Sequence, residues 1–127
     1  MGSSGKGGGI DELRQGRQSY VRRAWMDAYK SLSHADKAAP LGAQDLELLA
    51  TSAYMLGRDD DHVSALERAH HAHMDDGEAL PAVRCAFWVG VNLAMRGEMG
   101  RATGWFGRAQ RLARVSLRMS KGTAVER

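Results

Sequence analysis

Apolar residues along this chain recur every three or four positions, which is the spacing that places them on one face of an α-helix. Leu46, Leu49, Ala50 and Ala53, for example, fall on one side of a single segment. No segment alternates apolar and polar residues with the period of two that a half-buried strand shows. Glycine and proline lie between the periodic segments and mark their ends. The pattern predicts an all-α chain, with helices over about residues 10–21, 24–39, 44–56, 59–74, 80–95 and 98–114.

Small and large residues recur at fixed distances around the expected turns. Gly57 and Gly97 each separate two helices, and an alanine follows each glycine by twelve residues, at Ala69 and Ala109. A large apolar residue lies three positions before each of these alanines. The first helix pair keeps most of the pattern but has Arg23 at its turn in place of glycine. This spacing resembles the tetratricopeptide repeat (TPR), a helical hairpin.

The repeats also predict how the helices assemble. The first two units are 34 residues apart and the third is displaced by 40, so about six residues are inserted near residues 77–82. Small residues let the two helices of a hairpin approach closely, and no single hairpin covers its own apolar face. We therefore expect three antiparallel helix hairpins that stack as a short TPR-like right-handed solenoid.

The chain has 127 residues, which is enough for one domain with its own core. We expect the repeat domain to cover residues 10–115. Residues 1–9 are rich in glycine and serine, so they are expected to form a flexible tag or linker. The apolar pattern fades beyond Ser116, so residues 116–127 are expected to be a frayed tail.

A second resemblance covers residues 14–114. The segments that carry it are residues 16–25, 45–51, 57–60, 66–70, 84–88 and 108–112. They are similar to the helical-repeat region of bacterial LuxR-type transcriptional regulators, in which a repeat array precedes a C-terminal helix-turn-helix DNA-binding domain. The resemblance implies a non-catalytic protein or peptide interaction module within such a regulator. No recognition-helix unit is found after residue 114, so direct nucleic-acid binding does not carry over to this chain.

Composition narrows the class of protein further. Hydrophobic residues make up 43% and charged residues 26%, which is ordinary for a globular domain. No apolar run approaches the roughly 18 residues that cross a bilayer, and no apolar segment of a secretory signal opens the chain. The single cysteine, Cys85, fits a reducing compartment. We therefore expect a cytoplasmic protein with no membrane partner.

Charge is unevenly distributed along the chain. Residues 43–82 carry two basic and nine acidic groups, whereas residues 83–127 carry nine basic and two acidic groups. Four arginines of the last expected helix and its continuation share one stripe, which is a candidate anion-binding surface and the basis of an alternative nucleic-acid function. A solvated face or an ion-pair face toward the acidic helices is the favoured interpretation. The stripe consists of Arg101, Arg108, Arg111 and Arg118.

Residue types that carry catalysis or bind metals occur without the partners that such sites need. His70 and His73 are one helical turn apart and could hold Zn²⁺, but no second pair of ligands has suitable spacing. Cys85 lies in an apolar segment, which favours a buried thiol over a nucleophile. The aspartates at residues 59–61 are better explained as helix caps than as a calcium loop. We expect no metal, no cofactor and no enzymatic activity.

The concave face of a TPR-like array is its usual ligand surface, and the resemblance assigns its residues by repeat position. This face alternates aromatic and polar groups, a composition that suits an extended or helical peptide. Packing against further repeats is the alternative for the same face. Small-molecule sensing, a third candidate function, needs a closed apolar pocket. The expected groove residues are Arg17, Tyr20, Glu47, Thr51, Tyr54, Arg84, Phe87 and Val91.

The last helix pair carries more large apolar residues than one hairpin can turn inward. They are Phe87, Trp88, Val91, Trp105, Phe106 and Leu112. Apolar surface left open in this way usually marks an interface. We therefore expect the C-terminal face to dock a partner protein or to form a weak homodimer, which the positive charge of residues 83–127 opposes.

Overall fold

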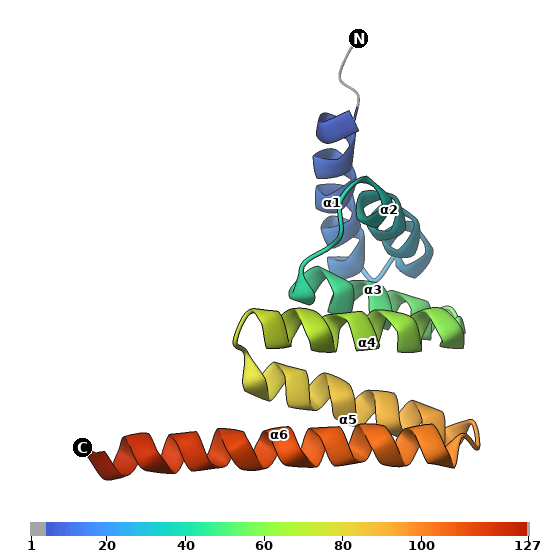
Figure 1. The fold of residues 1–127 in the computed structure, drawn as a ribbon. Coiled ribbons are helices and arrows are strands. Elements are labelled where there is room, and N and C mark those ends of the chain that lie inside the picture. Colours follow the sequence, from blue (N-terminus) through green and yellow to red (C-terminus); the bar gives the residue numbers. More distant parts are fainter. Residues whose placement is uncertain (1–4, 127) are drawn as a thin grey trace. The chain divides into compact units, whose positions relative to one another are not determined.

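The computed structural model describes residues 5–126 of the chain, and the side chains of residues 9–119. Figure 1 shows that the described chain is helical nearly throughout, and it contains no strand. This confirms the all-α prediction. No helix among the described residues has both the length and the apolar character needed to cross a bilayer. The helices are α1 (Gly5–Val21), α2 (Trp25–Ala38), α3 (Ala43–Met55), α4 (Asp59–Asp75), α5 (Ala79–Met95) and α6 (Met99–Glu126).

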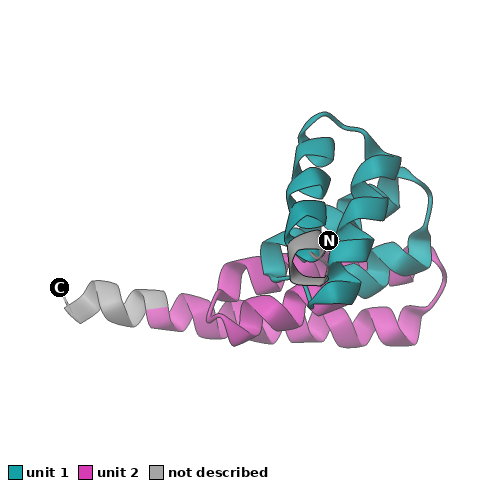
Figure 2. Cartoon of the chain, turned by 90° about the horizontal axis from the view of Figure 1, so that it is seen from above, with its two compact units in different colours: residues 1–65 teal, residues 66–127 magenta. Residues whose placement is uncertain are grey.

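The chain divides into two compact units, shown in Figure 2, where the sequence predicts a single repeat domain. Unit 1 covers residues 1–65 and unit 2 covers residues 66–127, so the division falls within α4. In unit 1, α1 packs on α2, and α3 contacts both. In unit 2, α5 packs on α6. Each unit therefore contains a packed helix pair of its own.

Each unit has a core of small and medium-sized apolar residues. Alanine is frequent in both cores, because helices that carry small residues on their facing sides can approach closely. Unit 1 buries Ala28, Leu32, Leu46, Ala50 and Ala53, and unit 2 buries Ala69, Ala82, Ala86, Val89, Leu93 and Ala102.

Four of the five turns between these helices have the same geometry. One residue in each has positive φ, and the next residue donates its backbone N–H to the carbonyl five positions earlier, at 2.8–2.9 Å. This is the Schellman motif, in which glycine is usual because L side chains are strained at positive φ. Arg23 adopts a φ of 63° at the turn that lacks a glycine. The other three positions are Gly57, Gly77 and Gly97.

A glycine lets two helices approach closely in each unit. A Cβ atom added at Gly16 would lie 2.8 Å from Cγ of Leu32, and one added at Gly90 would lie 2.7 Å from Cε1 of Phe106. Both glycines lie seven residues before the positive-φ residue of their turn, and both large partners lie nine residues after it. The spacing that marks the repeat in the sequence thus corresponds to the same close contact in α1–α2 and in α5–α6.

The inserted residues lengthen two helices. α4 has 17 residues where α2 has 14, and α5 has 17 where α3 has 13. Only residues 76–78 separate α4 from α5. Most of the insertion that the sequence places near residues 77–82 is therefore helical, and it extends the end of α4 and the start of α5.

The N-terminal helix starts earlier than the sequence indicates. α1 begins at Gly5, within the segment expected to be a flexible linker. Gly9 lies against the end of α2, where an added Cβ atom would be 3.0 Å from Cβ of Ala38. Contact with α2 therefore accompanies the extra helical turns. Residues 1–4 of the expected linker lie outside the described part of the chain.

The C-terminal helix also extends beyond its expected end. α6 continues to Glu126, although fraying is expected after Ser116. Residues 115–126 contain no proline, and glycine occurs only at Gly122. Proline and glycine are the residues that most often end a helix. Because neither occurs near Ser116, nothing in the sequence ends α6 there.

Candidate functional site

An apolar groove runs between α5 and α6 in unit 2, with a volume of about 430 Å³. Each helix contributes four residues at positions i, i+3, i+4 and i+7, so one face of each helix forms one wall of the groove. α5 contributes Leu80, Val83, Arg84 and Phe87, and α6 contributes Phe106, Ala109, Gln110 and Ala113.

Large apolar side chains stand at this groove with much of their surface exposed. Leu80 is 69% exposed and Phe87 is 46% exposed. The Phe87 ring packs against Phe106 at a centroid distance of 5.8 Å and edge-on against Trp88 at 5.4 Å. Trp88 is itself 49% exposed. These contacting side chains form an exposed apolar patch, and such patches usually mark interaction sites.

Three of the eight groove residues predicted from the repeat belong to unit 2. Arg84 and Phe87 lie together in the α5–α6 groove. Val91, one turn further along α5, is partly buried and does not line it. The prediction omits the α6 wall, because the TPR resemblance assigns the ligand surface to the first helix of each pair. The sequence did contain a signal for the α6 wall. Its four residues are spaced by three and four positions, which places them on one face of a helix.

Arg17, another predicted groove residue, takes part in an ion pair within unit 1. It lies on α1, and its guanidinium contacts Asp45 of α3 twice, with Nε–Oδ1 and Nη2–Oδ2 distances of 2.9 and 2.7 Å. The hydrogen bond to Asp45 raises the pKa of Arg17 above its ordinary value. Arg17 therefore links α1 to α3.

The remaining predicted groove residues of unit 1 lie on α1 and α3. Tyr20 is partly buried and packs edge-on against Trp25 at 5.5 Å. Tyr54 is exposed near the end of α3, and Glu47 and Thr51 are partly buried on the same helix.

The arginine stripe on α6 is partly engaged by neighbouring side chains. Arg101 donates hydrogen bonds to Glu98 at 3.1 Å and to Glu67 of α4 at 3.3 Å. The guanidinium of Arg108 lies over the Trp105 ring, 4.5 Å from its centroid. Arg101 thus forms the kind of inter-helix ion pair that the favoured interpretation of the stripe expects. The other two members of the stripe, Arg111 and Arg118, are exposed.

The two histidines considered as metal ligands are buried in unit 2. Nδ1 of His70 donates to the backbone oxygen of Ala82 at 2.8 Å, and Trp105 packs edge-on against the ring at 5.3 Å. Burial is the main cause that lowers the pKa of His70 below its ordinary value. Nδ1 of His73 lies 2.8 Å from a carboxylate oxygen of Glu78. Each imidazole therefore uses one ring nitrogen in a hydrogen bond within the protein.

The structure also places Cys85 and the aspartates of residues 59–61. Cys85 is 1% exposed on α5, which confirms the prediction of a buried thiol. The three aspartates occupy the first turn of α4, where carboxylates interact favourably with the helix dipole. Asp61 also accepts a hydrogen bond from the Tyr29 hydroxyl at 2.6 Å, which raises the pKa of Tyr29.

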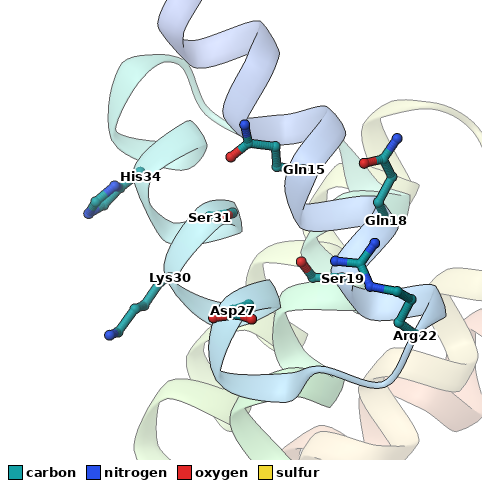
Figure 3. A pocket seen from close by; sticks show the side chains of 8 residues that line it. All are labelled: Gln15, Gln18, Ser19, Arg22, Asp27, Lys30, Ser31 and His34. Carbon is teal, nitrogen blue, oxygen red and sulfur yellow. The ribbon is translucent and has the colours of Figure 1, made fainter.

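A second concavity lies between α1 and α2 in unit 1, with a volume of about 410 Å³. Its lining consists of polar and charged side chains, three from α1, one from the turn that follows α1 and four from α2. A small-molecule sensor needs an apolar pocket, so this lining does not favour that alternative. Figure 3 shows the lining residues Gln15, Gln18, Ser19, Arg22, Asp27, Lys30, Ser31 and His34.

No family model, no curated protein and no solved structure matches this chain. The similarity to tetratricopeptide repeats and to LuxR-type regulators therefore rests on the residues of the chain alone.

Proposed function

We propose that this chain is a non-catalytic module that binds a protein or peptide, and that the α5–α6 groove of unit 2 is its binding surface. The observation that carries the proposal is an apolar groove whose α5 wall includes Leu80 and Phe87, both largely exposed. Covering apolar surface removes it from water, which favours association. Aromatic side chains in contact, such as Phe87 and Trp88, are typical anchors of such surfaces.

We also propose that the helices form a TPR-like array of three hairpins. The Schellman turns after α1, α3 and α5 support this architecture, as do the matching close contacts at Gly16 and Gly90. In such an array each hairpin covers the apolar face of the one before it, so the last hairpin keeps an open face. The groove belongs to that last hairpin. A place within a LuxR-type regulator remains a prediction from the sequence resemblance.

A displayed library of random peptides, each of about 16 residues, tests the binding proposal without favouring any chemistry. Peptides selected on the whole chain are expected to lose at least about tenfold in affinity for the Phe87→Ser variant. Fluorescence anisotropy measures the affinity, and circular dichroism checks that the variant keeps its helices. Since Phe87 is already half exposed, its replacement is expected to leave the fold intact.

The matched control is Ile10→Ser, which removes a large apolar side chain that is 62% exposed in unit 1. This variant is expected to bind the selected peptides as tightly as the unchanged chain does. The proposal is wrong if no peptide is selected. It is also wrong if the selected peptides bind Phe87→Ser and Leu80→Ser with unchanged affinity.

A further inference from the structure

The walls of the α5–α6 groove favour a helical occupant over an extended one. The wall residues lie within α5 and α6, where backbone groups bond along their own helix. An extended peptide would find no free backbone groups in these walls, so its own backbone groups that face the walls would lack hydrogen-bond partners. A helix satisfies its backbone internally and presents an apolar stripe to a groove of this kind.

The exposed side chains of α5 set the spacing that this occupant needs. Leu80 and Phe87 are seven residues apart, which is about 10 Å along the helix. An apolar stripe at positions i, i+4, i+7 and i+11 of a partner helix extends over about 16 Å and covers both side chains.

Charge determines what should flank that stripe. Within residues 99–119 α6 carries no carboxylate, and Glu98 in the turn before it pairs with Arg101. The nearest acidic residues to α5 along the chain, Asp75, Asp76 and Glu78, precede that helix. Arg84 lines the groove on α5. On α6, Arg114 is exposed, follows the wall residue Ala113, and lies one helical turn beyond Gln110. The α6 rim of the groove is therefore basic.

We infer that the α5–α6 groove binds a partner α-helix whose apolar stripe is flanked by carboxylates, an inference that rests on the proposed function. Carboxylates on such a helix meet Arg114 on the α6 rim, and complementary charge selects the partner and speeds its association. Two copies of this chain that met groove to groove would bring their basic α6 rims together, so like charges oppose that symmetric contact.

Two peptides of about 18 residues, stapled so that both are helical, test the inference. Both carry leucine at i, i+4, i+7 and i+11, and they differ in having glutamate or lysine beside that stripe. In about 50 mM salt, the glutamate peptide is expected to bind at least about tenfold more tightly by fluorescence anisotropy. The difference should narrow in about 500 mM salt, because salt screens exposed charges.

Reversal of one rim charge provides the matched variant. Arg114→Glu should weaken binding of the glutamate peptide and strengthen binding of the lysine peptide. Arg14→Glu makes the same change at an exposed position of α1 in unit 1, and should alter neither affinity. Both positions are exposed, so both variants are expected to keep the helical circular dichroism of the unchanged chain.

Several outcomes overturn the inference. If the two peptides bind with equal affinity, the partner need not be acidic. If neither peptide binds, the partner is not a helix of this kind. In both cases the binding function stands if the random library still yields peptides that depend on Phe87. If sedimentation velocity shows a dimer that Phe87→Ser abolishes, the occupant of the groove is a second copy of the chain. Binding of duplex DNA that Arg114→Glu abolishes would assign the basic rim to nucleic acid.

Discussion

Replacement of Gly90 by alanine tests the close contact between α5 and α6. A Cβ atom at this position would lie 2.7 Å from Cε1 and 2.8 Å from Cδ1 of Phe106. Carbon atoms are at their best separation at about 3.5–4.0 Å, so the ring must move by about 1 Å or the helices must separate. Overpacking of this kind costs about 1–3 kcal/mol. Removal of a glycine from a helix interior returns about 1 kcal/mol. We expect a net loss of about 1 kcal/mol.

Gly104→Ala is the control for this measurement. Gly104 lies on α6, and an added Cβ atom would have no neighbour within 4 Å. Only the helix propensity then changes, so this variant should gain about 1 kcal/mol. Urea unfolding followed by circular dichroism gives both free energies of unfolding, and the two variants should move the midpoint in opposite directions.

A double variant identifies the contact that is responsible. Phe106→Leu shortens the side chain that faces Gly90, so Gly90→Ala should cost less in that background than in the unchanged chain. The difference between the two costs is the coupling energy of the pair. The reasoning is refuted if Gly90→Ala stabilises the chain as much as Gly104→Ala does.

Two further predictions concern the first turn and the buried histidine. Arg23→Gly removes a side chain from a positive-φ position, so it should raise the melting temperature of the chain. Gly97→Ala adds a side chain at such a position, so it should lower the melting temperature and destabilise the fold by about 1 kcal/mol. If both variants melt at the temperature of the unchanged chain, this assignment of the turns is wrong. Burial lowers the pKa of His70, so the unfolded chain binds more protons than the folded chain just below the ordinary histidine pKa. The contribution of His70 to stability is therefore present above that value and is lost as the pH falls through it toward the lower folded pKa. The urea midpoint should change less between about pH 7.5 and pH 5 for His70→Gln than for the unchanged chain. If the midpoint changes equally in both proteins, His70 is not the cause of the loss of stability at low pH.

The repeated spacing in the sequence was informative because it reflects contacts between neighbouring helices. Small residues at Gly16 and Gly90 leave room for the large residues that follow the turn, so the contact leaves a pattern in the sequence. The turn at Arg23 shows the limit of that pattern, since the same backbone geometry forms there without glycine. Conformation at a turn depends on the hydrogen bonds that close it as well as on residue type.

The candidate site was only partly predictable. Arg84 and Phe87 were expected in a groove, whereas Phe106 was one of six large apolar residues of which the last hairpin can turn only some inward and must leave others open. Phe106 belongs to both groups, because it contacts Gly90 and also lines the groove. Periodicity identifies the face of a helix that is apolar, but it does not tell whether a neighbour covers the whole of that face. The helical end of α6 was missed because no motif signals that a helix continues.

The burial of Cys85 makes its thiol a probe of local unfolding. It is the only thiol in the chain, it lies on α5, and it is 1% exposed. A thiol reagent can react only when this part of the protein opens, so the labelling rate relative to that of an unfolded chain reports the opening equilibrium. Circular dichroism averages all the helices, whereas the thiol responds only to opening around Cys85. Labelling at urea concentrations below the dichroism midpoint would show that unit 2 opens while other helices persist.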